Sequence, residues 1–345
     1  MNVAIVGAGI IGCAIAEDLS RRGYRVEVFD ARQVGAGATH ATAGVLAPFI
    51  EAPSPGPLQE LAVQSLALYD GFVSTARTGA DAEIEYRRCG TFEVAGAADG
   101  EHRLQRVAEM ARAVRLTPSW FPTDPDARQT RGTADAGLLI HEQGYVRVEH
   151  LLAALRRSAE RYGAVFHEHR PVLETSPRPD HVLLTTAGGS FAYGAVIVAA
   201  GSWSDGVGPE RPGIRPVRGQ LLRLHWKAQP LPHVMWTDDC YVVPWLDGTV
   251  LVGATVEDVG FDERTTAGGI SGLLTAVQRF LPDAADATFL EARAGLRPAS
   301  PDGLPIIRPS SVSRRVIYAT GHYRNGILLA PLTARLVRAL VAQIG

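Results

Sequence analysis

The chain has 345 residues, of which 46% are apolar and 20% are charged, a balance typical of a folded protein with a substantial core and not of a disordered one. Its length allows one large domain or two interleaved domains, and we expect two. The 34 Lys and Arg residues nearly balance the 36 Asp and Glu residues, and the net charge of −2 excludes a global field that would attract polyanions. Nucleic acid is therefore not an expected partner.

The cysteines and the N-terminus bear on the compartment. Cys13, Cys89 and Cys240 form no C-x-x-C pair, which predicts neither a disulfide framework nor a metal site and favours a reducing cytoplasm. The apolar N-terminus lacks the basic region of a signal peptide, and no apolar run reaches the roughly 18 residues that a transmembrane helix needs. We expect a cytoplasmic protein that is not exported and has no membrane partner.

The first thirty residues predict a βαβ unit. Residues 3–6 are an apolar run typical of a short buried strand, Gly12 to Arg22 reads as a helix closed by Gly23, and Tyr24 to Phe29 reads as a second strand. The glycines between the first strand and the helix have the spacing G-x-G-x-x-G. A helix that follows such a turn offers free backbone N–H groups to phosphate, so the pattern indicates a Rossmann-like dinucleotide-binding domain.

The residues of this motif have separate expected tasks. Gly7 makes the turn, Gly9 lets the backbone approach a pyrophosphate, and Gly12 permits close packing of the helix on the strand. Asp30 follows about twenty residues later, where a carboxylate accepts hydrogen bonds from a ribose diol. Strand, helix and acid are all in register, which strengthens the prediction of a bound dinucleotide.

The rest of the chain alternates helical and strand-like segments. The expected helices, in chain order, run from Leu58 to Ala76, near 100–115 and from Val148 to Tyr162. Strands are expected at 90–94, from residue 164, in a meander or hairpin over 182–200 that ends in a buried parallel strand, and at 217–224, 241–244 and 249–253.

The spacing of these elements predicts an α/β fold with two interleaved domains. The nucleotide-binding domain would comprise residues 1–80, 147–215 and 295–345. A substrate-side α+β domain with an antiparallel sheet would comprise residues 81–146 and 216–294, because strand signals recur at meander spacing in the second of these segments.

Two further segments bear on the type of cofactor. The run from Val34 to Leu46 is a long loop of small residues that could follow an extended ligand closely, although a flexible glycine loop is the alternative reading. Near the C-terminus, Gly321 to Pro331 places an arginine beside a glycine-rich loop that opens a helix. That pairing suggests an anionic substrate held next to a cofactor ring.

Seven segments together carry a resemblance to a known family. They are GAGIIG at the start, GATHATAG, AAGSWS, CYVVPW, VGATVEDVGFD, AGLRPASPDGLPIIR and GHYRNGILLAP, and they extend from end to end of the chain. The chain resembles the D-amino acid oxidase family of flavoenzymes, and within it the glycine-oxidising branch that serves thiamine biosynthesis. This resemblance implies an FAD domain of glutathione-reductase type interrupted by an antiparallel substrate domain.

The resemblance also implies which residues bind FAD. The helix that begins near Gly326 would direct its positive end at the flavin pyrimidine ring and favour the anionic reduced form. The implied cofactor residues are Gly7, Gly9, Ile10, Ile11, Gly12, Asp30, Ala31, Ala38, Thr39, Ala43, Gly44, Val45, Val172, Ala200, Gly201, Trp203, Gly321, His322, Tyr323, Arg324, Asn325, Gly326 and Ile327.

The substrate residues that the resemblance implies are Tyr241, Arg297 and Arg324. Arg297 and Tyr241 would clamp the amino-acid carboxylate, for which a guanidinium suits because its rigid fork meets both oxygens. Arg324 would add a second arginine at the flavin edge. From spacing alone, a structural salt bridge for Arg297 and ordinary strand packing for Tyr241 remain open alternatives. No residue is expected to act as an acid or base, and His322 is expected to serve the flavin loop through its backbone.

The implied reaction is oxidative deamination of glycine or another small amino acid by hydride transfer from Cα to flavin N5, with oxygen as acceptor and peroxide as product. Alternatives are an oxidase or dehydrogenase of sarcosine, a D-amino acid or proline, and an FAD-holding subunit without activity. His40 lies in the small-residue loop, where a related histidine carries covalent FAD, but its placement differs and we expect non-covalent FAD. The resemblance also implies that the chain assembles as a homo-oligomer, namely a homotetramer.

Overall fold

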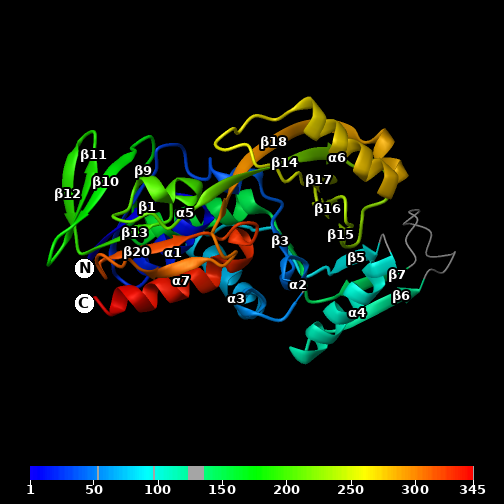
Figure 1. Cartoon of the computed structure of the whole chain (residues 1–345), viewed down its shortest axis with the longest axis horizontal. Helices are drawn as coiled ribbons and strands as arrows, with labels where there is room; N and C mark the ends of the chain where they lie inside the picture. Colours follow the sequence, from blue (N-terminus) through cyan, green and yellow to red (C-terminus); the bar gives the residue numbers. More distant parts are fainter. Residues whose placement is uncertain (53, 96–97, 123–135, 345) are drawn as a thin grey trace.

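A computed structural model describes residues 1–52, 54–95, 98–122 and 136–344 of the chain. Residues 123–135, which belong to the predicted substrate domain, lie outside the described part. The two ends of the chain lie close together beside the first sheet (Figure 1). None of the helices in the described ranges is both long and apolar enough to cross a membrane.

The first sheet has six strands in the order β19, β20, β13, β1, β2, β9. Pairing is parallel except between β19 and β20, as expected for a Rossmann-like sheet. Val3 to Val6 and the whole of β13 are buried, which explains why these runs are apolar throughout. The bounds are β1 Asn2–Val6, β2 Arg25–Phe29, β9 Val165–His167, β13 Ala195–Val198, β19 Ile306–Pro309 and β20 Val316–Thr320.

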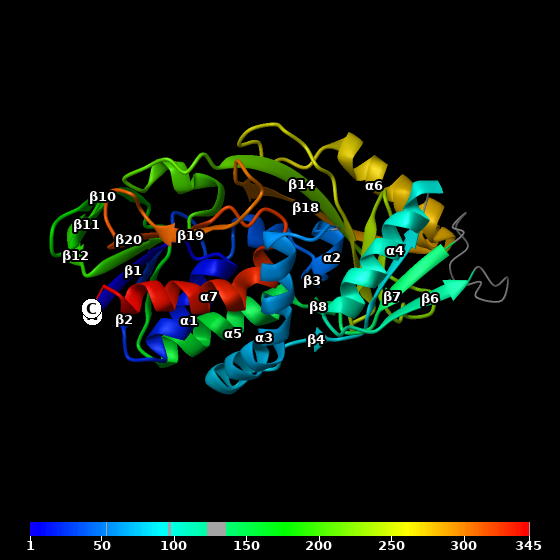
Figure 2. The same ribbon diagram turned by 60° about the horizontal axis from the view of Figure 1, so that its bottom comes forward.

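Two layers cover this sheet, because successive side chains of a strand point to opposite faces. Val3, Ile5 and Ile197 belong to a buried cluster that also includes residues of four helices on one face (Figure 2). Ala4 and Val198 pack against a three-stranded antiparallel sheet on the other. The helices are α1 Ile10–Ser20, α3 Pro57–Ala80, α5 Val148–Arg161 and α7 Gly326–Ala342, and the small sheet is β10 Val172–Pro177, β11 Val182–Thr186 and β12 Gly189–Tyr193.

The second large sheet has eight strands in the order β18, β14, β17, β16, β15, β5, β7, β6. Neighbouring strands of this sheet pair antiparallel, except that β15 pairs with β5 in parallel. The predicted meander did not include this parallel pair. The strands are β5 Thr91–Ala95, β6 Pro118–Pro122, β7 Ala136–Ile140, β14 Arg215–His225, β15 Val234–Trp236, β16 Tyr241–Pro244, β17 Thr249–Gly253 and β18 Thr288–Ala299. Helices α4 Ala98–Ala113 and α6 Ala267–Phe280 pack against it.

Shorter elements join these layers. Strands β3 Val45–Leu46, β8 Gly144–Val146 and β4 Tyr86–Arg87 form a small antiparallel sheet, and α2 Pro48–Glu51 follows β3. Three 3₁₀ helices, η1 Ala38–Ala41, η2 Gly201–Gly206 and η3 Pro282–Asp286, complete the described elements.

The mixed α/β architecture confirms the predicted fold class, with small shifts at element ends. Helix α1 begins at Ile10, two residues before the expected start at Gly12. Helix α3 extends four residues past Ala76, to Ala80. The division into two domains stays a prediction, and its expected borders near residues 215 and 294 fall within β14 and β18, which pair with each other along their length (Figure 1).

Candidate functional site

A cavity of about 670 Å³ lies at the carboxyl ends of the parallel strands of the first sheet and reaches the second sheet at β16. This is the edge at which open α/β sheets bind ligands. Of the residues predicted to bind cofactor or substrate, all but Gly12, Gly44 and Gly321 line it. Those that do are Gly7, Gly9, Ile10, Ile11, Asp30, Ala31, Ala38, Thr39, Ala43, Val45, Val172, Ala200, Gly201, Trp203, Tyr241, Arg297, His322, Tyr323, Arg324, Asn325, Gly326 and Ile327.

The turn from β1 to α1 depends on its glycines. A Cβ on Gly7, whose φ is +107°, would lie 2.3 Å from the carbonyl oxygen of Ala199, and one on Gly12 would lie 1.9 Å from the oxygen of Gly7. Gly12 therefore serves packing and not ligand contact. Helix α1 has no side-chain cap, and the N–H of Ile10 donates to Thr39 Oγ1 over 3.0 Å. Its exposed positive end at the cavity suits a phosphate group.

Asp30, at the end of β2, holds the glycine turn in place. Its Oδ2 accepts the N–H of Ala8 at 2.7 Å, and its Oδ1 accepts the N–H of Arg32 at 2.8 Å. Each carboxylate oxygen has a further lone pair, so the predicted contact with a ribose diol is compatible with these bonds. The aspartate side chain is long enough for its carboxylate to reach the N–H of Ala8 in this turn.

The small-residue loop lies along the same cavity. Gly44 (φ +76°) permits close approach to β8, because a Cβ there would lie 1.9 Å from the oxygen of Val146. Ala43 and Val45 on either side line the cavity. His40 is exposed and is not among the lining residues, and its carbonyl oxygen accepts a hydrogen bond from Arg293. Its side chain therefore forms no part of the cavity lining.

At the part of the cavity near Asp30, sequence reasoning missed a cluster contributed by the loop after β17. Arg32 forms an ion pair with Glu263 (Nη1 to Oε2, 2.9 Å), and its guanidinium lies 4.5 Å from the ring centre of Trp203. Trp203 in turn contacts Phe261, with ring centres 5.6 Å apart. A segment about 230 residues away in sequence thereby contributes to the cavity wall near Asp30, and no local sequence pattern predicts this contact.

The C-terminal segment turns sharply before α7. Gly321 has φ +74° and packs against Ser300, so it serves the turn and not the cavity lining. His322 is buried, and its Nε2 lies 2.9 Å from Thr333 Oγ1. Burial lowers the pKa of His322 to about 3, so its ring is neutral. Helix α7 begins at Gly326 with its N-terminus at the cavity.

The three predicted substrate residues come from three separate segments and meet at the same cavity. Tyr241 stacks on Trp236 with ring centres 4.7 Å apart, and the Arg324 guanidinium lies 5.9 Å from the centre of the Trp236 ring. Arg297 Nη1 donates to the carbonyl oxygen of Thr255 at 2.9 Å. Trp236 contacts both Tyr241 and Arg324. It was not predicted as a site residue, because a single Trp on a short strand has no distinctive sequence pattern.

Two glycines make room for two of the predicted substrate residues, Arg297 and Tyr241. A Cβ on Gly219 would lie 2.1 Å from Arg297 Nη2, and one on Gly253 would lie 2.2 Å from the Tyr241 hydroxyl. Both lie within strands, where glycine otherwise weakens the structure. Their sequence positions are not unusual, so only the tertiary contacts explain them.

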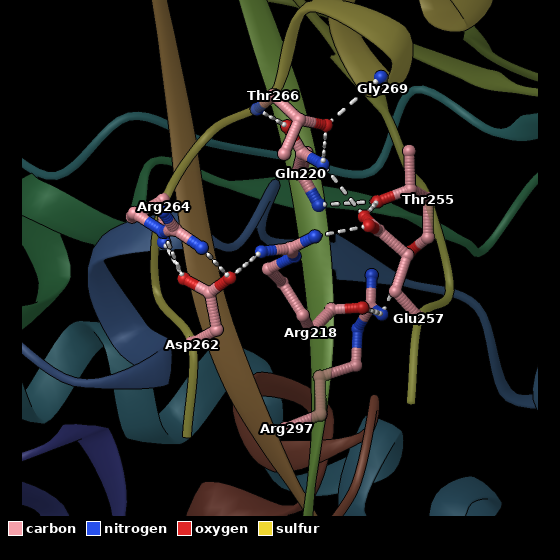
Figure 3. Close-up of polar contacts among 9 residues, drawn as sticks. All are labelled: Arg218, Gln220, Thr255, Glu257, Asp262, Arg264, Thr266, Gly269 and Arg297. Carbon is pink, nitrogen blue, oxygen red and sulfur yellow. Dashed lines mark hydrogen bonds and ion pairs between the residues drawn. The ribbon is translucent and has the colours of Figure 1, made fainter. Parts of the chain in front are cut away.

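A polar network lies behind Arg297 (Figure 3). Arg218, whose side chain is 4% exposed, pairs with Glu257, and Gln220 donates to Glu257 Oε1 at 2.7 Å. Thr255 donates to Glu257 at 2.6 Å and accepts the N–H of Gln220 at 2.8 Å. Burial raises the pKa of Glu257, but these hydrogen bonds outweigh it and hold that pKa at about 2. The network fixes the carbonyl that Arg297 contacts.

A smaller compartment of about 220 Å³ adjoins the predicted substrate residues. It shares Trp236, Tyr241 and Arg324 with the main cavity, and the ion pair of buried Glu93 with partly exposed Arg103 adds to its wall. Burial raises the pKa of Glu93, and Arg103 opposes that rise.

Comparison with known proteins identifies the family. A family described as FAD dependent oxidoreductase (DAO) matches residues 2–340. The chain belongs to this family. FAD is accordingly its cofactor, and the DAO resemblance predicted from the motifs is confirmed.

Known proteins are similar to this DAO-family chain over 99% of its length. Glycine oxidase of Geobacillus kaustophilus (strain HTA426) is 33% identical, with 99% of this chain and 93% of that protein covered. The crystal structure of glycine oxidase from Geobacillus kaustophilus aligns with a TM-score of 0.94 at 32% identity, covering 99% of this chain and 94% of that one. A bifunctional protein ThiO/ThiG of Synechocystis sp. is 32% identical over 99% of this chain and 51% of its own length.

Another solved relative acts on a different amine according to its name. Iminodiacetate oxidase from Chelativorans sp. BNC1 aligns with a TM-score of 0.87 at 26% identity, covering 99% of this chain and 95% of that one. The DAO fold thus accommodates more than one substrate.

The residues at the cavity fit FAD. The N-terminus of α1, where the capping residue Gly9 has no side chain, can take a pyrophosphate. Asp30 keeps lone pairs for a ribose, and the loop of η1 and β3 lines the wall with small side chains. The first turn of α7 brings a second positive helix end to the same cavity.

Proposed function

We propose that this DAO-family enzyme oxidises glycine or another small amino acid to the imino acid. The observation that carries the proposal is the meeting of Tyr241, Arg297 and Arg324 at the cavity that α1 and α7 also line. Similarity to glycine oxidases along the full chain supports the same substrate class. The alternative of an FAD-holding subunit without activity would not require these three side chains together.

Arg297 and Tyr241 bind the substrate carboxylate in this proposal. A guanidinium cannot lose its proton at ordinary pH and forms paired hydrogen bonds with a carboxylate. Arg297 is held from behind by Thr255 and by the carbonyl oxygen of Arg218, at 2.9 and 3.3 Å. This support lets the side chain present a fixed geometry to the substrate.

Arg324 and Trp236 limit the size of the substrate. Both line the main cavity and the smaller compartment, so they stand at the passage between the two. An amino acid with a large side chain would have to displace one of them. The proposed preference for a small substrate rests on this position.

The predicted cofactor residues at the cavity would hold FAD without a covalent bond. Bound FAD would accept the hydride that leaves the substrate Cα, and oxygen would reoxidise the enzyme and release hydrogen peroxide. The residues of the chain bind and orient the substrate with its amine neutral. His322 is not placed as a base, because its Nε2 is engaged with Thr333.

A second substrate class is favoured by one observation. The smaller compartment beyond Trp236 offers space for an N-substituent, and an iminodiacetate oxidase has the same fold at 26% identity. Sarcosine and other open-chain N-substituted glycines are therefore the second candidates, ahead of D-amino acids and proline.

Anaerobic bleaching of the bound flavin by a panel of glycine, sarcosine, iminodiacetate, D-alanine and proline tests the proposal, with a peroxide assay in air. We expect glycine to bleach the flavin and to produce peroxide. Bleaching without peroxide would identify a dehydrogenase, and no bleaching by any amine would favour the FAD-holding subunit.

A role in thiamine biosynthesis is part of the proposal, supported by the ThiO/ThiG relative. Assembly as a homotetramer and a cytoplasmic location stay predictions. Light scattering during gel filtration measures the first directly.

A further inference from the structure

Helix α7 contains a proline in its second turn. In a regular helix the N–H of residue 331 would donate to the carbonyl oxygen of Ile327, but Pro331 has no N–H. Ile327 is buried, at 4% exposure, so its carbonyl needs another donor.

Tyr69 of α3 supplies that donor. Its hydroxyl donates to the carbonyl oxygen of Ile327 over 2.9 Å. Tyr69 is fully buried, and its ring centre lies 5.7 Å from that of Phe72 and 5.8 Å from that of Tyr86, so the hydroxyl has a fixed place. Burial raises the pKa of Tyr69 well above its usual value, which keeps the hydroxyl protonated as a donor.

Ser65 lies one turn earlier in α3 and contacts the next carbonyl of α7. Its Oγ donates to the oxygen of Leu328 at 2.6 Å and accepts the N–H of Leu332 at 3.4 Å. Leu332 is the residue whose N–H would bond Leu328 in a regular helix. The serine hydroxyl therefore bridges the helix bond next to the proline, and α3 and α7 lie side by side over this stretch (Figure 2).

The carbonyls bonded by α3 belong to the turn that faces the cofactor. Asn325, Gly326, Ile327 and Leu328 line the main cavity. The first N–H groups of a helix have no partner within it and carry its positive potential. A small tilt of this turn would move those groups relative to the cavity. Tyr69 is not among the lining residues, so any effect it has on the flavin must pass through α7.

We propose that Tyr69 and Ser65 are positioning residues for the flavin: their hydroxyls replace helix bonds lost or weakened at Pro331 and so hold the first turn of α7 toward the cofactor. The inference rests on the proposed placement of the flavin at α7 and not on which amine is oxidised.

The test uses the holoenzyme with Tyr69→Phe and measures sulfite binding, the flavin midpoint potential and the Kd for FAD. Sulfite adds to the oxidised flavin as an anion and so reports positive potential near the ring. Loss of a donor to a buried carbonyl changes the equilibrium between the held and the displaced α7 turn by about tenfold. Because sulfite binding depends on the position of this turn, we expect the sulfite Kd to rise at least about fivefold. We expect the midpoint potential to fall as well.

Tyr318→Phe is the matched control. Tyr318 is also fully buried and donates to a backbone carbonyl, that of Glu210 at 2.8 Å, but it contacts neither the cavity nor the first turn of α7. We expect it to lower the unfolding temperature while leaving sulfite binding and the potential unchanged.

Pro331→Ala restores the missing N–H and completes the test as a double-mutant cycle. In the P331A background the helix can satisfy Ile327 by itself, so Tyr69→Phe should alter sulfite binding much less than in the wild type. Equal effects in both backgrounds would overturn the inference. A Tyr69→Phe protein that only unfolds earlier, with sulfite Kd and potential unchanged, would overturn it too.

Ser65→Ala serves where Tyr69→Phe yields no folded protein, with the same readouts and the same expected direction. These flavin measurements need no amine substrate. If the wild type oxidises none of the amines tested but the flavin readouts shift as expected, the proposed substrate fails and this inference stands.

Discussion

The guanidinium of Arg297 donates a hydrogen bond to the carbonyl oxygen of Thr255, 2.9 Å away. This bond joins β18 to the segment that follows β17, and the network of Arg218, Gln220 and Glu257 holds that segment in turn (Figure 3). A residue expected to bind the substrate is thereby supported by two other parts of the chain, β14 and the segment that follows β17.

Arg297→Ala should lower kcat/KM for glycine at least about tenfold, because each charge-assisted hydrogen bond to a carboxylate contributes roughly 1.5–3 kcal/mol. FAD content should not change. Steady-state kinetics and the flavin-to-protein absorbance ratio measure the two quantities. Arg308→Ala, which removes an exposed side chain of β19, is the control and should leave both unaltered. An unchanged kcat/KM in the Arg297 variant would remove that residue from the substrate site.

Gly219→Ala should reproduce much of that loss, because the added Cβ would lie 2.1 Å from Arg297 Nη2 and displace the guanidinium. Since both changes act on one side chain, the double variant should be little worse than Arg297→Ala alone. Gly272→Ala, where a Cβ would meet open space in α6, is the matched control and should retain full activity. Additive losses in the double variant would show that Gly219 acts elsewhere.

Glu263→Gln should speed FAD dissociation by about two- to fivefold, the range expected when a partly exposed ion pair is lost. The pair with Arg32 lies at the cavity wall near Asp30, so the effect should diminish at high salt. Stopped-flow release of FAD measures the rate. Arg264→Gln is the control, since its side chain is 85% exposed and bonds Asp262. The same release rate in the Glu263 variant and wild type would contradict the assignment.

Acidification should destabilise the wild type more steeply than His322→Gln. The pKa of His322 is lowered to about 3 in the folded state, so between about 3 and its ordinary value near 6.5 the unfolded chain binds more protons. The contribution of the neutral His322 ring to the free energy of unfolding is therefore complete above pH 6.5 and is lost as the pH falls. The free energy of unfolding changes through this group by at most about 1.4 kcal/mol per pH unit. Urea unfolding at pH 5, 6, 7 and 8 measures this. The two slopes should coincide above pH 7, and parallel slopes below pH 6 would refute the prediction.

Acid precipitation of the holoenzyme should leave the yellow colour in the supernatant, because FAD is expected to be non-covalent. His40 is exposed, and it is not among the residues that line the cavity, which argues against a covalent link through its ring. Colour in the pellet of the wild type that disappears in His40→Ala would establish the link instead.

Local sequence determined the cofactor fold, because its signals are local. The turn at Gly7 and Gly12 leaves no space for a Cβ, buried parallel strands are apolar throughout, and α7 begins at Gly326, so each could be predicted from a few neighbouring residues. The motifs identified the DAO family and therefore FAD.

The tertiary structure alone decided how the site is supported. Gly219 faces Arg297, Glu263 reaches Arg32, and Tyr69 bonds the carbonyl of Ile327, across separations of 78, 231 and 258 residues. Such contacts have no sequence period, because they depend on which strands pair and which helices pack together. The sequence was therefore sufficient to predict the cofactor. The residues that hold Arg297 and the first turn of α7 in place could be recognised only in the folded structure, where distant segments are in contact.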